Sequence, residues 1–180
     1  MDKTKIHLVS GLEFPGAAIN DWLWDEISVI TDTLEKGGIG PIVAWGDFAL
    51  IYYGIPTVCT NYFFLVPDAC VAPAHQALLD IGYVDNPTPR GIRSMPGDRQ
   101  NVPSFEILSP IRNNHLRRFA FEGFSTCPLF NKIDLKIFEK RSGLAIPPLR
   151  TLAHSFAAAA VAVPEKYLLL QSLFVVWACY

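Results

Sequence analysis

The alternation of apolar and polar residues divides the chain into helical and extended segments. An amphipathic helix is predicted from Asn20 or Asp21 to Lys36, because apolar residues recur there at the spacing of one helix face. Gly37-Gly38 follow as a helix stop signal. The apolar residues of this face are Leu23, Ile27, Ile30 and Leu34.

Shorter apolar runs organise the next part of the chain. They predict a strand over 42–45, a helix over 47–53, a strand over 58–66 and a helix over 71–81. Residues 86–102 contain prolines and glycines throughout and are interpreted as a loop. A loop of this length is typical of a lid, a binding loop or a disordered segment, and the sequence leaves its role open.

The second half of the chain is expected to complete the sheet and then become helical. Strands are predicted over 104–108 and 132–138, the latter because apolar and charged residues alternate as they do in a half-buried strand. After a Pro-Pro pair, apolar helices over 149–162 and 165–179 are expected to pack as a C-terminal helical hairpin. The predicted fold class is therefore α+β, a mixed β-sheet flanked by helices.

Length and composition are typical of one domain with a large apolar interior. The 180 residues predict a single domain over 1–180, with its core over about 20–138 and its C-terminal helices over about 149–180. The chain is 51% hydrophobic and only 18% charged, which favours a large core, an apolar pocket or a self-association surface.

The charge distribution argues against nucleic acid as a partner. The formal net charge is −2, and one local basic cluster, Arg112, Arg117 and Arg118, is interpreted as solvated surface. A nucleic-acid-binding face is normally broader, with interleaved aromatic residues.

The cysteine pattern and the chain ends favour a cytoplasmic protein. The four cysteines form no C-x-x-C pair, so we interpret them as buried thiols in a reducing compartment. No basic-then-apolar leader opens the sequence. The apolar region 156–180 is divided at Pro164 into pieces too short for a membrane span, so no membrane association is expected.

Residues 41–68 carry a resemblance to a known family. An apolar run leads into Trp45-Gly46-Asp47, followed by a short helix, a turn and a second apolar run. This order resembles the core of the nucleotidyltransferase fold (the DNA polymerase β-like superfamily), in which a strand ends in Gly-Gly or Gly-Ser and the next strand carries Asp-x-Asp. It also resembles small fungal proteins with the pattern WG-x-x-AL-x-x-YG-[IV]-P. The resemblance implies a nucleotidyltransferase-like sheet.

The metal ligands of that family are missing from this chain. Its Asp-x-Asp position reads Asn61-Tyr62-Phe63, and no Asp or Glu lies between Asp47 and Asp68. Residues i and i+2 of a strand point to the same face, which is how the paired carboxylates hold magnesium ions. We therefore expect a pseudo-nucleotidyltransferase with no metal site and no cofactor.

The family's third carboxylate has two candidates here. Glu106 or Asp134 could hold that place, or both could be outward-facing polar residues of alternating strands. The sequence leaves this open.

If the resemblance holds, a cleft lies where Trp45-Gly46-Asp47 faces Asn61 and Phe63. Its lining would be aromatic with a few polar groups, which is typical of a small-molecule pocket. The alternatives are core packing for Trp45 and Phe63, and a first-turn helix acid for Asp47. The substrate-binding candidates are Trp45, Tyr52, Phe63 and Phe105, and the catalytic candidates are Asp47, Asn61 and His115, which could transfer protons or donate hydrogen bonds.

Three functions remain open on the sequence. The first is a cofactor-free enzyme that positions an apolar small molecule for reaction, such as a cyclase, pericyclase or isomerase of secondary metabolism. The second is a non-catalytic binding or assembly module, in which the apolar C-terminal helices form a homodimer or partner face. The third is a nucleotidyltransferase with displaced metal ligands, using Glu106, Asp134 or Asp68.

Overall fold

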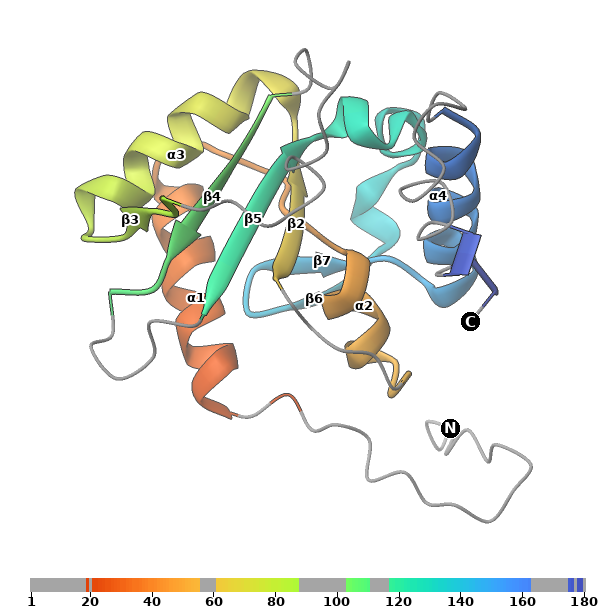
Figure 1. The fold of residues 1–180 in the computed structure, drawn as a ribbon, viewed down its shortest axis with the longest axis horizontal. Helices are drawn as coiled ribbons and strands as arrows, with labels where there is room; N and C mark the ends of the chain where they lie inside the picture. Colours follow the sequence, from red (N-terminus) through yellow and green to blue (C-terminus); the bar gives the residue numbers. More distant parts are fainter. Residues whose placement is uncertain are drawn as a thin grey trace.

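The computed structural model shows a mixed α+β fold built on one seven-stranded sheet (Figure 1). It describes residues 19, 21–55, 61–87, 103–110, 117–162, 175–176 and 178–179. The four α-helices are α1 (Asp21–Lys36), α2 (Gly46–Tyr52), α3 (Val71–Asp80) and α4 (Leu149–Ala162). The strands are β1 (Val43–Trp45), β2 (Tyr62–Val66), β3 (Val84–Asp85), β4 (Ser104–Leu108), β5 (Arg118–Gly123), β6 (Glu139–Arg141) and β7 (Leu144–Ile146). The predicted class of a mixed sheet with flanking helices is confirmed.

The strands follow the order β3-β4-β5-β2-β1-β7-β6 across the sheet. At its centre, β2 pairs antiparallel with β1 and parallel with β5, and β1 pairs parallel with β7. The outer pairs, β3 with β4, β4 with β5 and β6 with β7, are antiparallel. The two strands that the resemblance singled out, β1 and β2, are therefore adjacent interior strands of the sheet.

The register defines two faces of the sheet, because directly paired residues project to the same side. On one face, here called the Trp45 face, Trp45 pairs with Phe63, Phe63 with Ala120, and Ala120 with Glu106. On the other, here called the Phe64 face, the corresponding row is Ala44, Phe64, Phe121 and Phe105.

Different helices cover the two faces. Phe48 of α2 packs edge-on against Phe64, and His75 of α3 stacks on Phe105, so these helices lie on the Phe64 face. Helix α4 lies on the Trp45 face, where the Phe156 ring contacts the Trp45 ring. Figure 1 shows α1 and α3 on one side of the strands and α4 on the other.

Helix α1 forms and ends as its sequence predicts. Its predicted apolar face is buried, and its bounds match the expected range. At its C-terminus Gly38 adopts φ +69°, the Gly38 N–H bonds to the Glu35 carbonyl, and the Ile39 N–H bonds to the Leu34 carbonyl. This pair of bonds is a Schellman motif, which needs a left-handed residue and so favours glycine.

The predicted strand over 132–138 is wrong. These residues form turns and a short 3₁₀ helix, η6 (Leu135–Ile137), and Ile137 is largely exposed. The Asp134 side chain accepts a hydrogen bond from the Lys136 N–H and so begins η6 instead of facing out from a strand. The alternation of apolar and charged residues is real, but no neighbouring strand pairs with it.

Four strands were missed, namely β3, β5, β6 and β7, and β3 is only two residues long. Strand β5 is buried on both faces and carries Arg118 and Glu122, so it shows neither a clean alternation nor an apolar run. Strands β6 and β7 form a hairpin closed by Ser142 and Gly143, with φ of 48° and 73°. Two consecutive positive φ angles are typical of a type I′ turn, whose twist matches that of the strands.

Parts of other predictions lie outside the described residues. The helix over 149–162 is confirmed as α4, whereas most of the predicted partner helix over 165–179 falls outside, with 175–176 and 178–179 helical. Residues 58–60 of a predicted strand and 88–102 of the predicted loop also fall outside. Within the described part of the chain, no helix is long and apolar enough to cross a membrane.

Candidate functional site

Trp45 lies at the end of β1 and is completely buried. Its Nε1–H donates a hydrogen bond to the Ser155 hydroxyl of α4 at 2.9 Å, and that hydroxyl donates in turn to the Leu152 carbonyl at 2.6 Å. The Trp45 ring centroid lies 5.5 Å from that of Phe156. The indole N–H therefore fixes α4 to the sheet and is already engaged inside the protein.

Gly46 joins β1 directly to α2. Its φ is +59°, and a Cβ at this position would lie 3.1 Å from the Phe63 ring. Both the left-handed backbone and the close approach of Phe63 favour glycine here. The structure thus brings Trp45, Gly46 and Phe63 together, as the sequence predicted.

The two predicted polar groups of this site are also buried. Asp47 is in the first turn of α2 and Asn61 immediately precedes β2, with exposed fractions of 6% and 1%. Because β1 and β2 run antiparallel, both residues lie at the same end of the strand pair, beyond Trp45 and Phe63. The Asp47 carboxylate and the Asn61 amide are therefore next to the Trp45–Phe63 pair and are buried in the core, not exposed on the surface of a cleft.

The remaining predicted site residues do not join this group. Phe105 is on the Phe64 face, stacked on Phe121 at 4.8 Å and on His75 at 4.7 Å. Tyr52 ends α2 with its ring 5.2 Å from Tyr53, and burial, followed by the charge of Glu139, raises the pKa of its phenol. His115 lies outside the described residues.

A pocket of about 380 Å³ opens beside the predicted site. It lies between α2, the first turns of α4 and the C-terminal residues 178–179. Its volume falls in the range of small-molecule sites, which is roughly 300–1,000 Å³. Its described lining consists of Leu50, Leu149, Arg150, Leu152, Ala153, Phe156, Ala178 and Cys179.

The pocket is linked to Trp45 through one residue. Phe156 lines the pocket and also contacts the Trp45 ring, so Trp45 lies one layer beneath the pocket wall. None of the seven predicted site residues is among the described lining residues. The signal in the sequence that could have located this pocket is the apolar C-terminal region, which predicts a helical hairpin and not a pocket wall.

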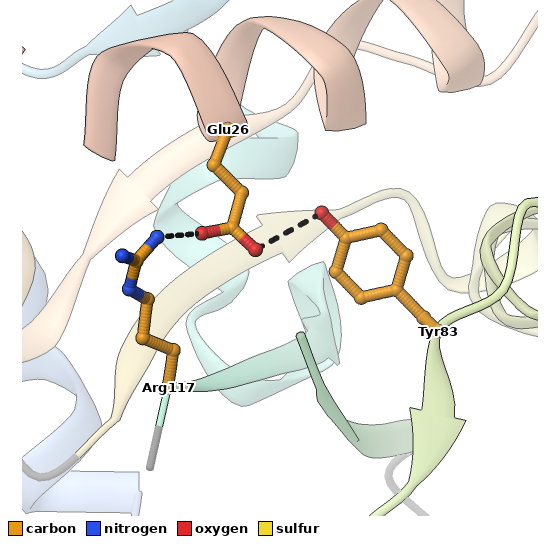
Figure 2. A network of polar contacts seen from close by, with 3 residues as sticks. All are labelled: Glu26, Tyr83 and Arg117. Atoms are coloured by element: carbon orange, nitrogen blue, oxygen red, sulfur yellow. Dashed lines mark hydrogen bonds and ion pairs between the residues drawn. The ribbon is translucent and has the colours of Figure 1, made fainter. Parts of the chain in front are cut away.

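The prediction that Arg117 is solvated surface is wrong, because its side chain is largely buried. Its guanidinium forms an ion pair with the buried carboxylate of Glu26 on α1 (Figure 2). The same guanidinium lies 3.5 Å from the centre of the Trp22 ring. The Tyr83 hydroxyl donates to the other Glu26 oxygen at 3.4 Å, and burial, followed by the Glu26 charge, raises the pKa of Tyr83. Glu26 thus bonds to both Tyr83 and Arg117. We assign this network the role of holding α1 against the start of β5.

Two other acids project from the Trp45 face of the sheet. Glu106 on β4 accepts a hydrogen bond from the Asn86 amide at 2.9 Å, and Glu122 on β5 accepts one from the Thr126 hydroxyl at 2.7 Å. Both are buried, so Glu106 is not the outward-facing strand residue that the sequence also allowed. Among the described residues, no three His, Cys, Asp or Glu side chains are grouped closely enough to hold a metal ion.

The buried thiol of Cys127 is held in its neutral form. Burial raises its pKa to about 11, although hydrogen bonds from the Leu129 and Phe130 backbone and from Ser155 act in the opposite direction. A thiol with this pKa carries little thiolate at neutral pH and is a poor nucleophile. Cys127 therefore belongs to the packing between the η5 turn (Pro128–Asn131) and α4.

Comparison of the chain with protein-family models, with curated proteins and with solved structures finds no match. The function proposed below therefore rests on the residues and geometry described above.

Proposed function

We propose that this protein binds an apolar small molecule in the pocket between α2 and α4. The observation that carries the proposal is the pocket itself: about 380 Å³, with a described lining of leucine, alanine, phenylalanine and cysteine side chains and one arginine. Pockets of this size and polarity are typical ligand sites, since apolar walls bind most of the ligand surface and a few polar groups orient it.

The chemistry that fits such a lining is rearrangement of the bound molecule by positioning. The described lining contains no carboxylate and no histidine, and Asp47 and Asn61 are buried and not among the described lining residues. A cyclase, pericyclase or isomerase can lower its barrier by holding a flexible substrate near its reactive shape, without a proton donor at the reacting atoms. We propose this class, and a non-catalytic binding module is the alternative that the same lining favours.

We also propose that the fold is a degenerate nucleotidyltransferase fold. The support is the order of elements: β1 runs into α2 through Gly46, β2 returns antiparallel to β1, and β5 pairs parallel with β2. Asn61 and Phe63 stand where that family carries its paired carboxylates. On this proposal the nucleotide cleft has been filled by Trp45, Phe63 and α4.

The binding proposal is tested by titrating the protein with octanol, a neutral apolar probe, in an isothermal calorimeter. We expect saturable binding with a dissociation constant below about 1 mM, a modest affinity for a ligand of this size. Ala153→Trp, which places an indole in the pocket, should weaken binding at least about tenfold. The matched control Ala158→Trp makes the same change on the exposed side of α4 and should bind octanol like the wild type.

Each alternative has its own readout. If octanol does not bind, or if both tryptophan variants bind it like the wild type, the pocket proposal is wrong. Saturable binding of ATP that requires Mg²⁺ would support the nucleotidyltransferase with displaced ligands. Incubation with flexible polyenes, followed by mass spectrometry and chromatography, separates enzyme from binding module, because an isomeric product of unchanged mass appears only if the protein catalyses a rearrangement.

A further inference from the structure

The pocket between α2 and α4 has an apolar floor and a charged rim. Leu50, Leu152 and Phe156 are almost completely buried and form the floor, whereas Arg150 is exposed. Among the described lining residues, Arg150 is the one that carries a charge. The pocket therefore suits a molecule with an apolar body and one polar end.

The Arg150 guanidinium has capacity to bind a ligand. In the part of the chain that the structure describes, no carboxylate or carbonyl forms an ion pair or hydrogen bond with its side chain. An arginine side chain offers five N–H donors in a planar fork, a geometry that matches both oxygens of a carboxylate. A guanidinium at the rim of an apolar pocket would thus recognise a planar anion.

The position of Arg150 in the fold adds to this preference. It is the second residue of α4, a helix of 14 residues, so it lies at the positive end of that helix dipole. A negative group at the rim would gain from both the guanidinium and the first turn of the helix. The helix dipole favours an anion at the rim, but the pocket and the Arg150 guanidinium are the main determinants of the expected binding.

We propose that the natural ligand of this pocket is an apolar monocarboxylate, bound with its carboxylate at Arg150 and its hydrocarbon part against Leu50, Leu152 and Phe156. This inference rests on the proposed function and names its ligand class. A monoanion is the better match than a phosphate ester, because one guanidinium balances one charge and a phosphate near neutral pH carries up to two.

The test compares three probes that share one hydrocarbon chain: octanoate, octanol and octylammonium. Each is titrated into the wild type, into Arg150→Gln, which keeps hydrogen-bonding capacity but removes the charge, and into Lys140→Gln, which removes an exposed charge on β6, away from the pocket lining. For the wild type we expect octanoate to bind about fivefold more tightly than octanol, the scale of a partly exposed ion pair, and octylammonium more weakly than octanol.

The variants separate this inference from the proposed function. We expect Arg150→Gln to bind octanoate and octanol with equal affinity, and Lys140→Gln, outside the pocket lining, to keep both the fivefold preference and the octanol affinity of the wild type. The preference of the wild type should also shrink as salt is raised from 0.05 to 0.5 M. If octanol and octanoate bind the wild type equally, or if Arg150→Gln keeps the preference, the carboxylate inference is overturned while the apolar pocket stands. If no probe binds, the proposed function itself fails, and this inference fails with it.

Discussion

The indole N–H of Trp45 and the hydroxyl of Ser155 form a buried hydrogen bond of 2.9 Å between residues that are 110 positions apart. The bond fixes the middle of α4 over the end of β1, which is the arrangement that creates the pocket between α2 and α4. The stability of the α4 packing and the shape of the pocket therefore depend on the same contact.

We predict that Ser155→Ala lowers the free energy of unfolding by about 1–3 kcal/mol, because it leaves the Trp45 N–H buried without its acceptor. The measurement is urea denaturation followed by circular dichroism. Ser28→Ala is the matched control, since the Ser28 hydroxyl donates to the Trp24 carbonyl one turn earlier in α1. Equal small losses for the two variants would contradict the role assigned to Ser155.

Gly46→Ala is expected to destabilise the protein by at least about 1–2 kcal/mol. The new Cβ meets the Phe63 ring at 3.1 Å, and the backbone at φ +59° is strained for any residue with a Cβ. Gly37→Ala, where a Cβ meets its nearest atoms at an ordinary 3.4 Å, is the control. Thermal unfolding of the two variants compares them directly, and a Gly46→Ala protein as stable as Gly37→Ala would show that the close approach to Phe63 is relieved at little cost.

Removing the charge of Arg117 should be among the most damaging changes in the chain. Arg117→Met keeps much of the side-chain volume but leaves the Glu26 carboxylate buried without its cation, which we expect to cost about 3–5 kcal/mol. The double variant Arg117→Met with Glu26→Gln should recover part of this loss, because it no longer buries an unpaired charge. Denaturant titration of the wild type, of each single variant (Arg117→Met and Glu26→Gln) and of the double variant gives the coupling energy, and additive losses would mean that the two side chains do not interact.

Stability should fall as the pH rises from about 9 to about 11, in part because of Cys127. Its folded pKa of about 11 lies above the ordinary value of 9.0, so the folded state retains a proton that the unfolded state releases. The contribution of Cys127 is complete below pH 9 and is lost as the pH rises to its folded pKa, amounting to about 2 kcal/mol. Tyr53, with a pKa raised to about 12 by burial and then by the charges of Tyr52 and Glu139, extends the loss above pH 10.

The Cys127 contribution is isolated by comparing slopes. Urea denaturation under reducing conditions between pH 8 and 11 should give a shallower decline for Cys127→Ala than for the wild type, whatever the absolute stability of the variant. Parallel curves would show that this thiol does not titrate with an elevated pKa in the folded protein.

The long, strongly periodic elements could be predicted from the sequence. Helices α1 and α4 match the expected ranges 21–36 and 149–162, because their apolar faces recur over several turns and glycine or proline marks an end. Short strands were harder to predict, because a strand forms only where a second strand is available to pair with its backbone. Residues 133–137 alternate like a strand and have none, whereas Phe119 and Phe121 form one in a segment whose pattern is irregular.

Only part of the candidate site was visible in the sequence. The contact of Trp45 with Phe63 followed from the order of strand, glycine, helix and strand, which is local information. The pocket was missed because it forms between α2 and α4, and nothing in the segment around Leu50 indicates that residues a hundred positions later will line the same pocket. Burial of the Trp45 indole N–H against Ser155 was missed for the same reason.

The most direct test of the central claim is to locate the bound probe by methyl NMR. The protein is labelled on its leucine, valine and alanine methyl groups and titrated with octanol. We predict saturable shifts for Leu50, Leu152 and Ala153, all in the pocket lining, and none for Leu78 and Val71 of α3, which are buried in the core and are not lining residues. Saturable shifts confined to methyl groups outside the lining, or none at any concentration, would contradict the claim that this pocket is a ligand site.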